Sequence, residues 1–167
     1  MTAKSLLTGA SLAFAGRALL GRVLLAKFTA DVQRLNAGDH SGLLAAYADD
    51  AVLRFTVGEH RFAGEWRGKD EIARFMENFA AAGLQGEIEQ IAMSGPPWAM
   101  TLWAKFSDRA ASPADGTELY ANRTVLVLRT RWGKIAVHED FYFDTASIAE
   151  FDRRLTELGI APVPKSG

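Results

Sequence analysis

The sequence contains no cysteine among its 167 residues. This absence excludes disulfide bonds, thiolate catalysis and cysteine-ligated zinc. Histidine is also scarce, with His40, His60 and His138 as the three copies, and they do not form the HExxH pattern of a zinc-binding helix. We therefore expect no metal site.

An excess of positive charge is lacking as well. The chain has 19 Lys and Arg against 20 Asp and Glu, which gives a formal net charge of −1. A surface that binds a phosphate backbone needs clustered positive charge, so nucleic acid is not an expected partner. The composition, 49% hydrophobic and 23% charged, is typical of a folded globular protein. At this length, we expect one domain with an ordinary hydrophobic core.

The N-terminal segment, residues 1–22, differs from the rest because it has basic residues and no acid. Three interpretations stay open: a helical extension of the first domain helix, a signal peptide cleaved after Ala13-Phe14-Ala15, and an amphipathic helix on an anionic membrane surface. A membrane-spanning helix is disfavoured because Arg17 would lie near its centre. Accordingly, we expect a cytoplasmic protein, with export or membrane association through residues 1–22 as the alternative.

We favour the helical extension because apolar residues recur at seven-residue spacing. Leu7, Phe14, Phe28 and Leu35 lie on one such grid. The spacing predicts a long first helix that ends near Gly38, which can adopt the left-handed conformation at a helix end. The expected organisation is an extension over 1–22, a domain over 23–158 and a flexible tail over 159–167.

Within the domain, the hydrophobic period changes from helical to alternating. Helical spacing predicts a short helix that includes Leu43, Leu44 and Tyr47, a helix around Phe75 that Gly83 ends, and a last helix over 144–158. Alternation predicts a strand at 52–57, a short strand near 62–66, and long strands at about 86–94, 97–107, 117–131 and 134–144. Helices followed by a long antiparallel meander indicate an α+β fold, a curved sheet wrapped around its helices.

This order of elements, together with several local strings, resembles the nuclear transport factor 2-like (NTF2-like) superfamily and its SnoaL-like branch. The supporting strings are 35–39, 44–52, Gly68 with Ile72 and Phe75, 132–135 and 142–144. The resemblance implies a cone-shaped cystatin-like roll around a mostly apolar cavity that takes a small hydrophobic molecule without a cofactor. It also implies a homodimer that forms through the outer face of the sheet.

The strand at 117–131 supports a sheet covered on both faces. Val125 and Val127 alternate with Leu126 and Leu128, so both faces of this strand are apolar. A partner subunit would cover the outer face, to which Trp103 adds apolar surface. The alternative is that the C-terminal helix covers it.

Two enzyme types of the superfamily do not match residue by residue. Ketosteroid isomerases resemble the chain near Asp49-Asp50-Ala51, but their catalytic base finds no acid in 53–56, and neither the first helix nor 120–130 supplies their oxyanion donors. Limonene-epoxide-hydrolase-like members need two aspartates and an arginine. The strand that should supply the arginine and one acid offers only Lys105 between residues 98 and 107. A count from residues 133–135 puts the other acid at Asp140, whereas a count back from residues 142–144 gives Phe141.

The orientation of the last strand decides whether Asp140 reaches the cavity. In one phase His138, Asp140 and Tyr142 point inward together; in the other, Phe141 and its apolar neighbours do, because a shift of one residue exchanges the faces. Hydrophobic pattern favours the second phase, and a β-bulge would allow part of each set to face inward. This choice stays open at the level of sequence.

If the first phase holds, the row of polar groups suits proton transfer next to a carbonyl group, as in the SnoaL-like cyclases that the chain resembles. We therefore predict a cofactor-free cyclase, isomerase or hydrolase with Asp140 and His138 as catalytic residues. The candidate ligand-binding residues are Tyr142, Asn122, Tyr47, Phe55, Trp98 and Phe75. The alternative is a non-catalytic ligand-binding or structural dimer module of the same fold.

Overall fold

The computed structural model describes the backbone of residues 3–165 and the side chains of residue 19 and residues 21–165. Two predictions therefore fall on side chains that are not described: the seven-residue spacing at Leu7 and Phe14, and the cleavage site at residues 13–15. The elements, in chain order, are α1 (Ala3–Asn36), α2 (Ser41–Ala46), β1 (Tyr47–Phe55), β2 (Gly64–Arg67), α3 (Gly68–Ala81), β3 (Gln85–Ser94), β4 (Thr101–Ala111), β5 (Glu118–Arg131), β6 (Lys134–Tyr142) and α4 (Ala146–Glu157).

One mixed sheet forms the framework, with strand order β2-β1-β6-β5-β4-β3. The strands from β3 to β6 form the predicted antiparallel meander, and β2 pairs with β1 in antiparallel orientation. β1 runs parallel to β6, which joins the N-terminal part of the domain to the last strand. The predicted α+β roll is therefore confirmed, with one parallel pair in a mostly antiparallel sheet.

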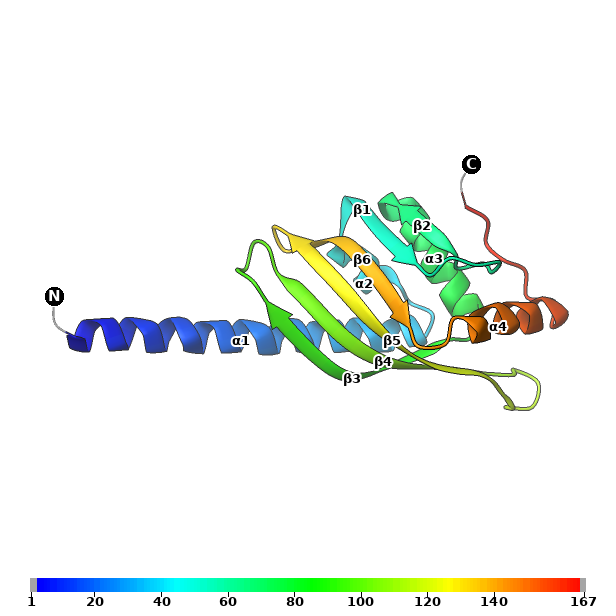
Figure 1. The fold of residues 1–167 in the computed structure, drawn as a ribbon, viewed down its shortest axis with the longest axis horizontal. Coiled ribbons are helices and arrows are strands. Elements are labelled where there is room, and N and C mark those ends of the chain that lie inside the picture. The colour runs from blue at the N-terminus through cyan, green and yellow to red at the C-terminus, as the bar shows by residue number, and fades with distance from the viewer. Residues whose placement is uncertain (1–2, 166–167) are drawn as a thin grey trace.

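The helices lie on one side of the sheet, and the core fills the space between (Figure 1). α3 presents Ile72, Phe75 and Met76 to this core, as its helical spacing predicts. α4 closes one end of the roll, where Phe151 stacks on Tyr120 with ring centroids 4.6 Å apart. Because α4 packs at this end, it does not cover the outer face of the sheet, where Phe141 is 56% exposed and Trp103 40% exposed.

α1 is one continuous helix of 34 residues, so the expected boundary at residue 22 lies inside it. Its C-terminal half packs behind the sheet through Phe28, Val32 and Leu35, while its N-terminal half extends past the sheet edge (Figure 1). Within the part of the chain that the structure describes, no helix combines the length and the apolar character needed to cross a membrane.

Several element boundaries differ from the prediction. Tyr47 begins β1 instead of lying on the second helix, and β4 runs from Thr101 to Ala111 instead of 97–107. The expected flexible tail is held against α3 over its described part: the side chain of Asn78 accepts a hydrogen bond from Val163 N at 2.8 Å and donates one to Val163 O at 2.9 Å.

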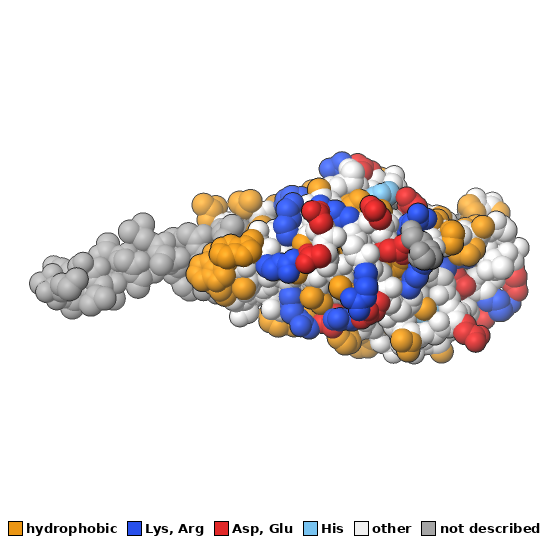
Figure 2. All heavy atoms as spheres, turned by 90° about the horizontal axis from the view of Figure 1, so that it is seen from above, with side chains coloured by type: hydrophobic (Ala, Val, Ile, Leu, Met, Phe, Trp, Pro, Cys, Tyr) orange, Lys and Arg blue, Asp and Glu red, His pale blue; other side chains and the backbone are white. Residues whose placement is uncertain are grey.

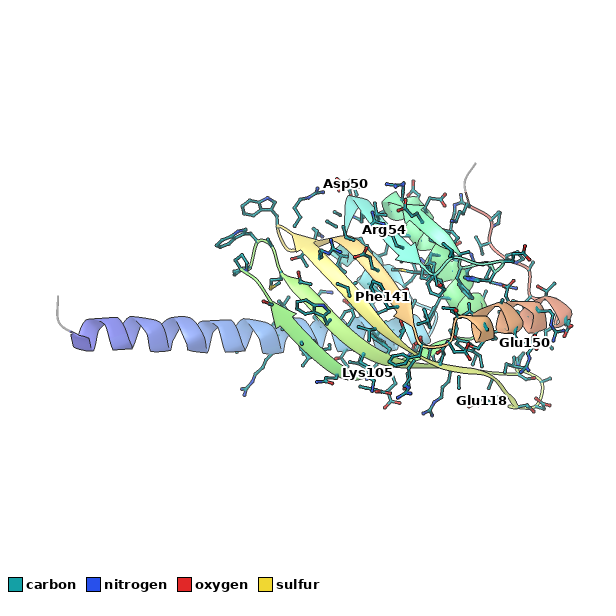
Figure 3. All side chains as sticks on the ribbon, viewed as in Figure 1. Asp50, Arg54, Lys105, Glu118, Phe141 and Glu150 are labelled. Atoms are coloured by element: carbon teal, nitrogen blue, oxygen red, sulfur yellow. The ribbon has the colours of Figure 1, made fainter. Side chains whose placement is uncertain are left out.

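Charged side chains of both signs are interspersed over the face of the domain in Figure 2, with a hydrophobic cluster at the end nearest the projecting part of α1. Figure 3 shows Arg54, Lys105 and Phe141 along the outer face of the sheet, away from α1. Two ion pairs on this face join Arg54 to Glu65 and Lys105 to Glu89, at 2.8 and 2.6 Å. On the face drawn in Figure 2, the described side chains therefore form no large region of one charge sign.

Candidate active site

A β-bulge in β6 brings the polar row of the last strand into the interior. Thr130 of β5 pairs with Ile135 and Arg129 pairs with Val137, so Ala136 is an extra residue without a partner. Ile135 and His138 are both buried as a result, although they are three residues apart. Ile135 of the apolar phase and the polar row that begins at His138 therefore face the interior together. This is the arrangement with a β-bulge, one of those that the sequence left open.

His138 lies at the centre of a buried hydrogen-bonded chain. Its Nδ1 atom is 2.5 Å from the Tyr47 hydroxyl, and its Nε2 atom is 2.7 Å from Asp140 Oδ1. The side chains of His138 and Asp140 are only 10% and 4% exposed. Since β1 is parallel to β6, Tyr47 at the start of β1 pairs with Ile135 and lies beside the bulge. The β1–β6 pairing therefore assembles the Tyr47–His138–Asp140 relay.

Tyr47 is the relay member whose proton is most firmly held. Burial, reinforced by the charge of Asp140, raises the pKa of Tyr47 well above its ordinary value, so this hydroxyl keeps its proton. The hydroxyl can donate that proton to Nδ1 of His138, and in the matching tautomer Nε2–H donates to Asp140 Oδ1. Asp140 is held in this way at the wall of the cavity.

Asp108 of β4 adds a second buried carboxyl group. It is 3% exposed, and its Oδ2 atom has no hydrogen-bond partner among the described residues. Burial raises the pKa of Asp108 from 3.8 to about 7; a hydrogen bond from Tyr142 opposes this shift, and the charge of Asp140 adds to it. Asp108 is therefore partly protonated near neutral pH and can donate a hydrogen bond or a proton.

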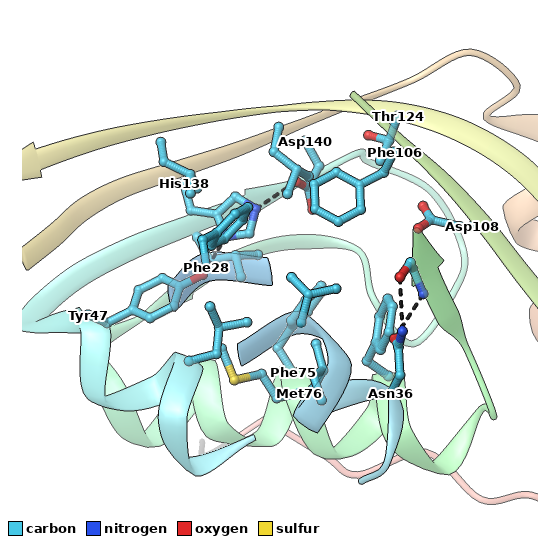
Figure 4. Close-up of a pocket in the computed structure, with 18 of the residues that line it drawn as sticks. Phe28, Asn36, Tyr47, Phe75, Met76, Phe106, Asp108, Thr124, His138 and Asp140 are labelled. Atoms are coloured by element: carbon cyan, nitrogen blue, oxygen red, sulfur yellow. Dashed lines mark hydrogen bonds and ion pairs between the residues drawn. The ribbon is translucent and has the colours of Figure 1, made fainter. Parts of the chain in front are cut away.

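These groups face one small cavity of about 70 Å³ between the sheet and the helices (Figure 4). In this view His138, Asp140 and Thr124 lie along the sheet, Asp108 lies at one end, and Phe75 and Met76 rise from α3 opposite them. The volume exceeds that of one water position. Most of the other lining residues are apolar: Phe28, Val32, Leu35, Leu43, Leu53, Phe79, Phe106, Leu126 and Leu128.

The structure brings some of the predicted ligand-binding residues to the cavity and places others elsewhere. Tyr47, Tyr142 and Phe75 line it together with the candidate catalytic residues. Phe55 lies behind it in the core, where its ring packs on Tyr142 with centroids 4.9 Å apart. Thus Phe55 supports a lining residue and is not one itself.

Asn122 and Trp98 are not in this cavity. The side chain of Asn122 donates to the carbonyl oxygen of Asp144 at 2.7 Å and to the Ser147 hydroxyl at 3.1 Å, and so connects β5 to the start of α4. Trp98 is 56% exposed in the turn before β4. Pro96 and Pro97 cannot donate strand hydrogen bonds, which explains why β4 begins only after Trp98.

Asp108 was not among the predicted site residues because the expected strand ended at residue 107. In the actual β4, Phe106 and Asp108 face inward, whereas Lys105 faces outward and pairs with Glu89. If the alternation of inward and outward side chains had been extended from Phe106 to residue 108, it would have placed this acid on the inner face.

Asn36 was also not predicted as a site residue. Its side chain joins α1 to β3 by paired hydrogen bonds to Gly86 N and Gly86 O, each 2.9 Å long.

Gly86 lies beside Asp108, where a side-chain Cβ atom would be in van der Waals contact with Asp108 Oδ1, at 3.4 Å. The packing is therefore close on this side of the carboxyl group. Across residues 3–165, no three His, Asp or Glu side chains gather in an arrangement that could hold a metal ion. The chemistry that this site can supply from its own residues is proton transfer and hydrogen bonding.

Comparison with known proteins agrees with this architecture. Residues 28–138 match the family model of the SnoaL-like domain. No curated protein matches the sequence. Similar solved structures include an NTF2-like protein of unknown function from Burkholderia pseudomallei, which is 19% identical with a TM-score of 0.62 over 77% of this chain and 95% of that one.

Two further structures of similar fold carry functional descriptions. A candidate polyketide cyclase from Xanthomonas campestris is 15% identical with a TM-score of 0.55, over 78% of this chain and 95% of that one. TerC, co-crystallised with polyporic acid, is 16% identical with a TM-score of 0.59, over 77% of this chain and 97% of that one. At these identities the likeness establishes the fold alone. With the match to the family model over most of its length, the chain belongs to the SnoaL-like domain family.

Proposed function

We propose that this protein is a cofactor-free acid–base enzyme that acts on a small hydrophobic carbonyl compound. The observation that carries the proposal is the pair of buried carboxyl groups, Asp140 and Asp108, facing one mostly apolar cavity. Two titratable groups in different environments are the arrangement that general acid–base catalysis requires. In this scheme Asp140 is the base and Asp108 is the acid.

The reaction begins with a carbonyl ligand in the cavity. Asp140 removes a proton from the carbon next to the carbonyl group, and protonated Asp108 transfers its proton to the carbonyl oxygen, which gives an enol. In ring closure the enol carbon attacks a second carbonyl group of the same molecule, the oxygen of that group takes the proton held by Asp140, and the enol proton returns to Asp108. In isomerisation Asp140 returns its proton to another carbon of the conjugated enol, and Asp108 recovers its own proton. His138 orients Asp140 and Tyr47 orients His138, through the 2.7 and 2.5 Å contacts.

A non-catalytic container of the same fold is the alternative function. A container for an apolar ligand gains nothing from buried carboxyl groups, because burial of an unpaired polar atom costs free energy. Asp108 Oδ2 is such an atom. Its presence in the cavity favours the enzyme.

Proton exchange tests this proposal without knowledge of the natural substrate. Phenylacetone in deuterated buffer, followed by NMR, reports removal of a proton next to a carbonyl group. We expect the wild-type protein to accelerate deuterium uptake, and Asp140→Asn to lower the rate by about 10²- to 10⁴-fold, the usual effect of losing a general base. Asp50→Asn, an exposed acid outside the cavity, is the matched control. Equal rates in the wild type and Asp140→Asn would refute the proposed role of Asp140.

We also propose that the chain forms a homodimer through the outer face of its sheet. Trp103 pairs with Val127, and Val125 pairs with Phe141, across neighbouring strands of this face. Trp103 and Phe141 remain exposed because α4 packs elsewhere. A second copy of the same face would bury this apolar surface.

A further inference from the structure

An apolar groove continues from the cavity toward the end of the domain from which α1 projects. It has a volume of about 350 Å³ and lies between α1 and the inner face of β4, β5 and β6. Its walls include partly exposed apolar side chains, among them Leu24, Met93, Met100 and Leu102. The cavity with the carboxyl groups is therefore only the inner part of a longer apolar space.

The groove and the cavity share three wall residues, Phe28, Leu43 and Leu128. α1 passes along both: residues 24–31 border the groove and residues 28–36 border the cavity. At the helical rise per residue, the groove portion of α1 spans about 10 Å. The half-buried ring of Phe28 stands where the two spaces meet and contacts the edge of Phe106, with centroids 6.1 Å apart.

The polar groups of the groove are engaged with the protein. Lys27 pairs with Asp31 at 2.5 Å, and Lys134 Nζ donates to the carbonyl oxygen of Ala45 at 2.7 Å. The Thr130 hydroxyl accepts a hydrogen bond from the backbone N–H of Met100 at 3.0 Å. What the groove offers a ligand is therefore aliphatic surface, and its flexible methionines can adapt to different shapes.

We propose that the groove binds the apolar chain of a ligand whose carbonyl group reaches Asp140 and Asp108, with Phe28 as the gate between the two parts. This inference rests on the proposed function, which it deepens by naming the substrate class: a carbonyl compound with an extended apolar chain. The small size of the inner cavity supports it, because an extended apolar chain attached to the carbonyl group has to continue outward, and the groove is the apolar continuation.

Calorimetric titration with straight-chain methyl ketones, from butanone to decanone, tests the groove. Each buried methylene group should strengthen binding by about fourfold until the groove is filled. Leu24→Glu places a charge in one wall, and Met100→Glu does so in the opposite wall. In both variants the gain with chain length should be lost for the longer ketones, whereas binding of butanone should persist.

Neighbouring residues that point away from the groove supply matched controls. Val23→Glu and Ala99→Glu introduce the same charge at exposed positions one residue away. Both should retain the wild-type dependence on chain length. Using two walls keeps the test valid if one variant fails to fold, which circular dichroism would reveal.

Several results would overturn the inference: wild-type affinity that does not rise with chain length, no measurable binding across the series, or the same loss in the control variants. A lower sedimentation coefficient for Leu24→Glu without ketone would identify the groove as a protein contact and overturn it as well. Failure of the proposed acid–base function would give a different result from failure of the groove inference. Binding would still increase with chain length, but neither the wild type nor Asp140→Asn would accelerate deuterium exchange.

Discussion

Replacing Asp108 with asparagine should stabilise the protein at alkaline pH. Asp108 is buried in the apolar cavity, and burial raises the pKa of its carboxyl group from 3.8 to about 7. In the unfolded chain the same group is solvated and ionises near its ordinary value. Between these two pKa values, the folded protein retains a proton that the unfolded chain releases.

The sign of the effect follows from this difference. Where the unfolded state binds fewer protons than the folded state, the free energy of unfolding falls as pH rises. The destabilisation begins near pH 3.8, grows through the window up to pH 7 and is complete above it. The separation of the two pKa values corresponds to about 4 kcal/mol. Asparagine has a similar shape and does not ionise, so Asp108→Asn should remove this penalty.

Urea unfolding monitored by circular dichroism at about pH 8.5 and about pH 5 provides the measurement. We expect a gain in the free energy of unfolding that approaches 4 kcal/mol at the higher pH and shrinks by more than half at the lower one. Glu59→Gln, which removes an exposed acid, is the control and should show little change at either pH. If Asp108→Asn is no more stable than the wild type at pH 8.5, or gains equally at both values, the assigned ionisation of Asp108 is wrong.

Three further predictions concern the relay, the corrected role of Asn122 and the outer face. Tyr47→Phe leaves Nδ1 of His138 without its donor, so urea unfolding should show a loss of about 1–3 kcal/mol and deuterium exchange should slow. Asn122→Ala should lower stability by a similar amount, but leave phenylacetone exchange unchanged, because Asn122 supports the start of α4. Phe141→Glu should convert the proposed dimer to a monomer in sedimentation velocity. Val57→Glu, at another exposed apolar residue, should not. A wild-type protein that sediments as a monomer would contradict the proposed dimer.

The order of elements could be predicted from sequence because each long element has a strong hydrophobic period. The failures occurred where tertiary structure decides. Tyr47 has helical spacing from Leu43 and Leu44, but its pairing with Ile135 of β6 makes it a strand residue. This pairing joins segments far apart in the chain, and local periodicity carries no information about it.

The orientation of Asp140 could not be predicted from sequence for a different reason. Alternation specifies a face only while the strand is regular, and the extra residue Ala136 changes the phase near the start of β6. Ile135 satisfies the apolar pattern before the bulge, and His138 and Asp140 follow the polar phase after it. The apolar phase therefore holds for Ile135, before the bulge, and the polar phase holds for His138, Asp140 and Tyr142 after it, while Phe141 faces outward.

The bulge also explains how a polar relay lies in an apolar interior. Without it, a strand that buries Ile135 would direct Phe141 inward and Asp140 to the outer face. Phe141 would fill the cavity, and the core would gain its hydrophobic burial. Instead, Asp140 takes the interior position, near Asp108 of β4, and Phe141 lies on the outer face that the proposed dimer would cover. Because burial of a carboxyl group opposes stability, the inward position of Asp140 is better explained by chemistry at the site than by the needs of folding.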